Sequence, residues 1–125
     1  MERKAAVSDA ELEILEVLWS AEGALNAGEI RARLGEDKSK RWERTTVLTL
    51  IQRLLKKKAI SQEKREVYYY APCIRREEYV KEETRQFVDK FFKGSSRNLA
   101  AALVNSEALS KEDIDELRNY FNENC

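Results

Sequence analysis

The sequence predicts a mainly α-helical fold in which three short helices and a β-hairpin precede a helical tail. Three observations support this. Apolar residues recur at helical spacing through most of residues 9–58. β-Branched and aromatic residues then gather in residues 60–71, as is typical of strands. Beyond Cys73 the apolar residues return in pairs at intervals of four or eight, which indicates amphipathic helices.

The first helix is predicted to begin after Ser8 and to end near Ala21. The Ser8 hydroxyl can cap the helix, and Glu11, three residues later, can complete a capping box. Val7 and Leu12 can form a hydrophobic staple at the same end. The side chains expected to face the core are those of Leu12, Leu15, Leu18 and Trp19.

A second, shorter helix is expected over roughly residues 27–34. Asn26 can cap it, with Glu29 at the third helical position. Gly35 stands where glycine commonly ends a helix, and a polar connector follows as far as Arg41. The residues expected to be buried are Ile30 and Leu34.

The third helix is predicted to begin at Glu43 or Arg44 and to end near Lys58. Its two faces differ sharply. The apolar face carries Val47, Leu50, Ile51, Leu54 and Leu55. The other face carries short hydroxyls and long cations with no carboxylate, which suits a groove lined with phosphates and base-edge acceptors. Its residues are Thr45, Thr46, Thr49, Gln52, Arg53, Lys56 and Lys57.

A hairpin follows, with strands over residues 60–63 and 67–71 and a turn over residues 64–66. Pro72 closes this unit, because proline can neither donate to a strand ladder nor continue a helix. A hairpin directly after a third helix has the position of a wing. Residues 1–73 are therefore predicted to form a winged helix-turn-helix domain that binds DNA. We expect Trp42 to pack in this domain, together with one or two residues of the run Tyr68–Tyr70.

Residues 74–125 are predicted to form a helical dimerisation domain. A helix of some 17 residues is broken at Gly94, a short helix follows, and Ser110 caps a third with Asp113 at its third helical position. A segment of this size buries little core alone, so its apolar faces are expected to meet a second copy in a symmetric homodimer. The residues expected at that interface are Tyr79, Phe87, Val88, Phe91, Leu99, Leu103, Ile114, Leu117 and Phe121.

The charge is distributed unevenly although the net charge is zero. Between Lys38 and Arg65 the chain has ten Lys or Arg residues and two carboxylates, Glu43 and Glu63. A local basic region of this kind favours nucleic-acid binding. The candidate DNA contacts are Arg44, Thr45, Thr46, Thr49, Arg53, Lys64 and Arg65.

Ordinary structural roles stand beside these assignments. The helix face can simply be solvated, with Thr45 as its cap. Cations at Lys56–Lys58 favour the helix dipole, and Lys64 and Arg65 can belong to a plain charged turn.

Several functional classes find no support in the composition. The chain has no His, no Gly-rich phosphate loop and no nucleophile motif, so we expect no enzymatic activity and no cofactor. Two distant Cys residues make a poor metal set, and no metal site is expected. No apolar run is long enough for a membrane span or a signal peptide, so we expect a cytoplasmic protein without membrane insertion.

Several motifs in this order resemble a known family. They are VSDAELEILEVLW at residues 7–19, Trp42 with Thr45-Thr46-Val47, TLIQRL at residues 49–54, VYYYAP at residues 67–72 and SKEDIDELR at residues 110–118. Residues 7–121 are similar to the BlaI/MecI/CopY family of bacterial repressors, which includes penicillinase, methicillin-resistance and copper-responsive repressors.

The resemblance implies a dimeric winged-helix repressor that binds a palindromic operator in double-stranded DNA, often that of an antibiotic-resistance operon. In the beta-lactam branch, a membrane sensor protease leads to cleavage of the repressor tail at an Asn-Phe pair. The matching pair here is Ala102-Leu103, a departure from that pattern. The copper branch carries C-terminal CxC motifs, whereas this sequence ends with the single Cys125.

Two other hypotheses fit the same patterns. The first is a ligand-responsive winged-helix regulator with a small molecule in the tail interface. The second is a winged helix used only for protein assembly, because a fold does not determine a function.

Overall fold

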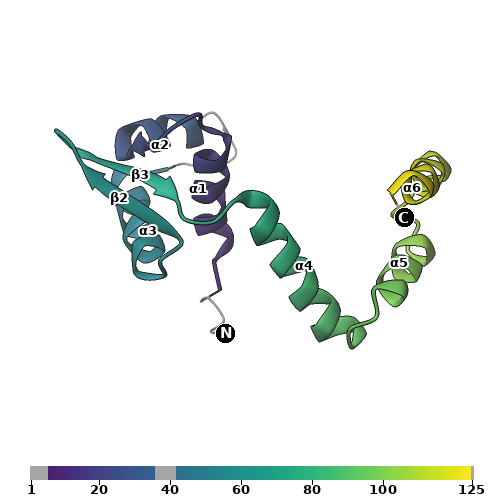
Figure 1. Cartoon of the computed structure of the whole chain (residues 1–125). Helices are drawn as coiled ribbons and strands as arrows, with labels where there is room; N and C mark the ends of the chain where they lie inside the picture. Colours follow the sequence, from purple (N-terminus) through teal and green to yellow (C-terminus); the bar gives the residue numbers. More distant parts are fainter. Residues whose placement is uncertain (1–5, 36–41, 125) are drawn as a thin grey trace. The chain divides into compact units, whose positions relative to one another are not determined.

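The computed structural model describes residues 6–35 and 42–124 and divides the chain into two compact units (Figure 1). The first unit ends at Tyr79 and the second begins at Val80. The connector expected over residues 36–41 lies outside the described residues. The elements are α1 (Asp9–Ser20), β1 (Leu25–Asn26), α2 (Ala27–Leu34), α3 (Arg44–Lys56), β2 (Ile60–Lys64), β3 (Tyr68–Pro72), α4 (Arg76–Phe92), α5 (Ser96–Asn105) and α6 (Lys111–Asn124).

Helix α1 begins with only half of the expected capping box. The Ser8 hydroxyl accepts a hydrogen bond from the Glu11 backbone N–H at 3.2 Å. The Glu11 carboxylate does not reach back to the cap; it is 2% exposed and pairs with Lys57 Nζ at 2.6 and 2.9 Å. Lys57 Nζ also donates to the Ala6 carbonyl at 2.9 Å. The second half of the capping-box prediction is therefore wrong, and Glu11 instead ties α1 to the end of α3.

The buried face of α1 is rotated from the predicted one. Leu15 and Leu18 are buried as expected, but Leu12 and Trp19 are only partly buried. Ile14, which the prediction missed, is fully buried. The buried positions, with Glu11 among them, follow the spacing of a single helical stripe.

Helix α2 matches its prediction closely. The Asn26 side chain accepts from the Glu29 N–H at 2.8 Å, and the Glu29 carboxylate accepts from the Asn26 N–H at 3.0 Å. Ile30 and Leu34 are buried. Gly35 follows with a right-handed φ of −67°, so the end of α2 does not use the left-handed conformation available to glycine.

A three-stranded antiparallel sheet covers this helical core, with strand order β1-β3-β2. The short strand β1 was not predicted; it pairs Leu25 with Tyr70. Strand β2 pairs with β3 in a hairpin that runs from Ile60 opposite Pro72 to Lys64 opposite Tyr68. The turn is therefore residues 65–67, one residue later than expected.

The core of the first unit joins all three helices to the sheet. Its members from outside the helices include Leu25, Trp42, Ile60 and Tyr70. The Trp42 side chain is 9% exposed, which confirms the packing prediction for it. Its carbonyl accepts from Arg31 Nε at 2.9 Å, which fixes the chain just before α3.

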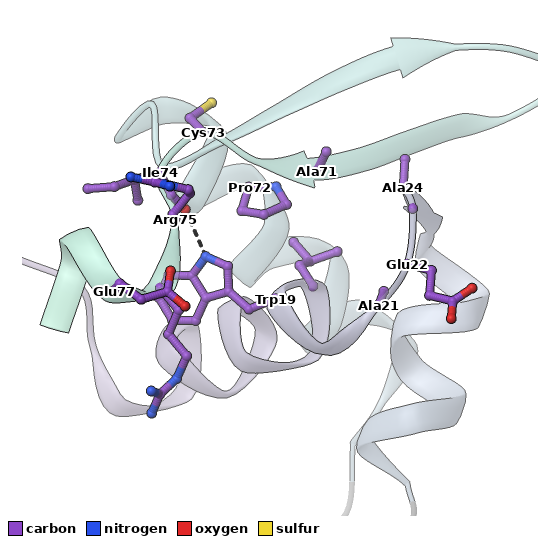
Figure 2. A pocket seen from close by; sticks show the side chains of 13 residues that line it. Trp19, Ala21, Glu22, Ala24, Ala71, Pro72, Cys73, Ile74, Arg75 and Glu77 are labelled. Carbon is purple, nitrogen blue, oxygen red and sulfur yellow. Dashed lines mark hydrogen bonds between the residues drawn. The ribbon is translucent and has the colours of Figure 1, made fainter.

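The first turn of α4 is attached to α1 within the first unit. Figure 2 shows the Trp19 indole pointing at the backbone of Ile74, to whose carbonyl Trp19 Nε1 donates at 2.8 Å. The Trp19 ring also lies 5.4 Å from that of Tyr79, measured between centroids. Arg76 Nε pairs with the Glu16 carboxylate at 2.9 Å. Three separate contacts therefore hold this end of α4.

The second unit is helical and contrasts with the first in burial. Helix α4 ends before Gly94, whose φ of +85° is the left-handed conformation that glycine adopts without strain. Ser95 caps α5, and Ser110 and Asp113 cap α6 through hydrogen bonds of 3.0 and 3.1 Å. Among the described residues, α5 and α6 contain no buried side chain.

In the described parts of the chain, no helix has the length and apolar character that a membrane crossing requires.

Candidate nucleic-acid interface

Helix α3 presents its polar face to solvent because its apolar face is anchored in the core. Val47, Leu50, Ile51 and Leu54 are buried, which fixes the rotation of the helix about its axis. The four candidates of the opposite face are all exposed: Thr45, Thr46, Thr49 and Arg53.

The threonines of this face differ in what they can offer. Thr49 Oγ1 donates to the Thr45 carbonyl at 2.9 Å, so its proton is used within the helix. Its oxygen remains an acceptor and its methyl group an apolar contact. Thr45 lies inside the helix, since the cap position belongs to Glu43, and the alternative of Thr45 as the cap is wrong.

The cations of α3 are not equally available. Arg44, Arg53 and Lys56 are exposed. Lys57 is only 24% exposed and is paired with Glu11. It is therefore not a free cation of the polar face, to which the sequence assigned it. The first turn of α3 contains no acidic residue, which leaves the exposed face without a carboxylate inside the helix.

The wing holds its two cations over aromatic rings. Lys64 Nζ lies 4.7 Å from the centroid of the Tyr68 ring, and Arg65 Cζ lies 4.4 Å from that of Tyr69. Arg65 Nε also contacts the Glu63 carboxylate at 3.1 Å and remains 50% exposed. At exposed sites each cation–π contact stabilises by about 0.5–1 kcal/mol, enough to bias where the cation sits. This role of Tyr68 and Tyr69 was not predicted from the sequence, because it depends on the strand register.

Tyr70 is the member of the tyrosine run that packs inward. It is 5% exposed, in agreement with the expectation that one or two of the three would pack on the helices. Burial raises the pKa of its phenol above the usual value, and the neighbouring Tyr68 adds to the shift.

The expected interface residues of the tail have different surroundings. Phe87, Phe91, Leu103, Leu117 and Phe121 are exposed, and Leu99 and Ile114 are partly buried. Val88 is 6% exposed within the chain itself. Tyr79 lies against Trp19 in the first unit. These two side chains are therefore already packed in the single chain.

Ala102 and Leu103 lie inside helix α5, two to three residues before its end. Leu103 is 39% exposed, whereas Ala102 is partly buried. The peptide bond between them is held in helical conformation. A protease binds its substrate in an extended form, so this bond can be cut only after α5 unwinds locally.

No group of three or more His, Cys, Asp or Glu residues stands close enough to hold a metal ion in residues 6–35 and 42–124. Cys73 is an exposed free thiol, and Cys125 lies outside the described residues.

Comparisons with known proteins agree with the resemblance seen in the sequence. The family model for the penicillinase repressor matches residues 7–123. A penicillinase repressor of Bacillus licheniformis is 30% identical over 124 residues, which cover 98% of this chain and 94% of that protein. The methicillin resistance regulatory protein MecI of Staphylococcus aureus (strain N315) is 31% identical over 117 residues, 93% of each chain.

Two solved structures share the fold of the first part of the chain. The solution structure of the DNA-binding domain of the repressor BlaI aligns with a TM-score of 0.53 at 34% identity, over 63% of this chain and 94% of that one. The monomeric form of Bacillus licheniformis BlaI in complex with the blaP half-operator aligns with a TM-score of 0.51 at 34% identity and the same coverage. These matches confirm the winged-helix fold class. The chain belongs to the penicillinase repressor family, a family of transcriptional repressors.

Proposed function

We propose that this protein is a dimeric transcriptional repressor that binds a palindromic operator in double-stranded DNA. The observation that carries the proposal is the exposed, carboxylate-free face of α3, fixed by the buried face behind it. The BlaI relative in complex with a half-operator supports a DNA role for the same fold. Relatives named penicillinase repressor and methicillin resistance regulatory protein favour an operon of beta-lactam resistance as the target. Because a repressor must reach its operator, we propose that the protein acts in the cytoplasm.

The DNA contacts divide into two kinds. Thr45, Thr46 and Thr49 can meet base edges or thymine methyl groups, with Thr49 acting as an acceptor because its proton is already donated. Cations contact phosphates and position the protein without reading the sequence. We assign that second role to Arg44, Arg53, Lys64 and Arg65.

The dimerisation domain predicted over residues 74–125 is proposed to be formed by the second unit, from Val80 onward, since residues 74–79 pack with the first unit. The exposed aromatic side chains there include Phe91 at 61% and Phe121 at 58%. Large apolar side chains in this number are rarely left in water, and a second copy of the same tail offers complementary apolar surface. Val88 and Tyr79 contribute through packing inside each chain rather than across the interface.

Relief of repression by proteolysis in the tail is the regulatory part of the proposal, with a sensor protease as a partner. Helix α5 has ten residues and no side chain buried within the single chain, so packing inside the chain adds little to the free energy of its local unwinding. Substitution Ala101→Pro should break the helix and speed cleavage of the 102–103 bond by the cognate protease, read by mass spectrometry of the fragments. Unchanged cleavage at another bond would remove Ala102-Leu103 from the proposal.

The test of DNA binding uses the full chain and DNA from directly upstream of its own gene. A discrete shifted band in moderate salt, resistant to excess nonspecific competitor, is the expected result. Absence of any binding at low salt would contradict the proposal and favour the use of the winged helix as a protein-assembly module.

A further inference from the structure

A cleft of about 520 Å³ opens beside the start of α3. Three parts of the first unit form it: α2 with the residue before it, the first turns of α3, and the start of β3 with Val67, the residue before it. Figure 1 shows these elements gathered in one unit. The volume lies in the range of small-molecule sites, which is about 300–1,000 Å³.

The exposed large apolar side chains of the first unit line this cleft. Val67 is 52% exposed and Tyr68 is 41% exposed, and both line the cleft. Every other large hydrophobic side chain described in the first unit is at least partly buried. Leu48, which is partly buried, adds an apolar wall from α3. Exposed apolar surface confined to a concave site marks a place where something binds.

The charge of the lining has one sign. Arg31 and Arg44 line the cleft, and no carboxylate is among its lining residues. Arg31 is held in place because its Nε donates to the Trp42 carbonyl at 2.9 Å. Arg44 is exposed and forms no ion pair within the described part of the chain. A guanidinium in this state is available for a carboxylate.

We propose that this cleft binds a small amphipathic organic anion, with an aromatic or branched apolar body and one carboxylate, and that the bound anion competes with operator DNA. The apolar body contacts Val67, Tyr68 and Leu48, and the carboxylate meets Arg44. Competition follows from position, because the cleft lies between α3 and the hairpin; this part rests on the proposed function. A duplex backbone is a poorer occupant, since its phosphates need several donors whereas most of the lining is apolar.

The probe for the first experiment is 2-naphthoate, a planar aromatic monocarboxylate, titrated into the ¹⁵N-labelled full chain. Amide shifts should saturate at residues of the cleft, Gly28, Arg44, Leu48 and Tyr68. The neutral analogue 2-naphthalenemethanol should bind at least about 10-fold more weakly, the factor that corresponds to loss of one charge-assisted contact. Equal affinity for acid and alcohol, or shifts confined to the tail, would overturn the proposal.

Variants separate the two parts of the site. Arg44→Gln should weaken naphthoate binding about 10-fold, whereas Arg97→Gln, an exposed cation of α5, should leave it unchanged. Val67→Ser, which removes apolar wall without touching a proposed DNA contact, should weaken it about 3-fold. Loss from Arg97→Gln as large as that from Arg44→Gln would show nonspecific attraction and contradict the site.

A second arm measures the operator. Naphthoate should raise the protein concentration needed to half-saturate a fluorescent operator duplex, and Val67→Ser should reduce that effect. Operator binding without any naphthoate-induced amide shifts would contradict the ligand site in the cleft and leave the repressor proposal intact. Naphthoate-induced shifts at the cleft in a protein that binds no DNA would support the ligand site and contradict the repressor proposal. If only the duplex shifts the cleft amides, the operator is the occupant and the inference is wrong.

Discussion

The two units of the chain solve the burial of apolar side chains in different ways. In the first, Ile14, Leu15, Ile30, Ile51 and Leu54 have no exposed surface. In the second, α5 and α6 bury no side chain, and Phe91 and Phe121 are more than half exposed. The first unit thus completes its own core, whereas the second presents apolar surface that needs another molecule. This division matches one unit for DNA and one for dimerisation.

Ile51→Ala is expected to have the largest effect on stability. It should lower the free energy of unfolding of the first unit by about 3–4 kcal/mol, because it leaves a cavity in a closed core. Phe121→Ala should change that free energy little. Denaturant unfolding followed by Trp fluorescence measures this, since both Trp residues, Trp19 and Trp42, belong to the first unit. Equal losses for the two variants would show one shared core.

Leu117→Asp tests the second unit. The side chain is 42% exposed in the single chain, so aspartate is tolerated there but would be buried without a partner in the dimer. The dissociation constant of the dimer should rise at least about 100-fold, measured by sedimentation velocity. Glu116→Gln is the matched control. A dimer that persists in Leu117→Asp would place the interface elsewhere.

Glu11→Gln probes the ion pair that joins α1 to α3. Loss of the carboxylate leaves Lys57, only 24% exposed, without its counterion, and about 2 kcal/mol of stability should be lost. The double variant Glu11→Met with Lys57→Met should recover most of it, because no buried charge remains. If the double variant unfolds as easily as the single one, the pair is needed for more than charge balance.

Thr46→Ala and Arg65→Ala distinguish recognition of the DNA sequence from positioning of the protein on the phosphates. The first should weaken specific binding by about 1 kcal/mol and nonspecific binding less. The second should weaken both and reduce the slope of log affinity against log salt by about one. Fluorescence anisotropy on operator and scrambled duplexes measures both effects. Equal losses on every sequence for both variants would contradict the recognition role of Thr46.

Local patterns were predicted best. The cap of α2 depends only on Asn26 and Glu29, three residues apart, and both halves formed. The buried stripe of α3 followed directly from its periodicity. The same holds for Ser110 at the start of α6. In both caps the interacting groups lie within one helical turn, so the sequence contains the whole interaction.

Features that depend on distant partners were missed. Strand β1 has two residues and exists through its pairing with β3, 45 positions along the chain at Leu25 and Tyr70. Glu11 was predicted to cap α1 because it lies three residues after Ser8. Its actual partner, Lys57, is 46 positions away and could not be inferred from that local spacing. The positions of Lys64 and Arg65 over tyrosine rings depend on the strand register, which composition does not reveal. The DNA contacts themselves remain predictions.

The most direct test of this division compares wild type with Leu117→Asp on two duplexes, a single half-site and the full palindrome. If one unit binds DNA and the other forms the dimer, both proteins should bind the half-site equally, and only wild type should gain affinity on the palindrome. Equal gain for the variant, or its failure to bind the half-site while still folded, would contradict the account.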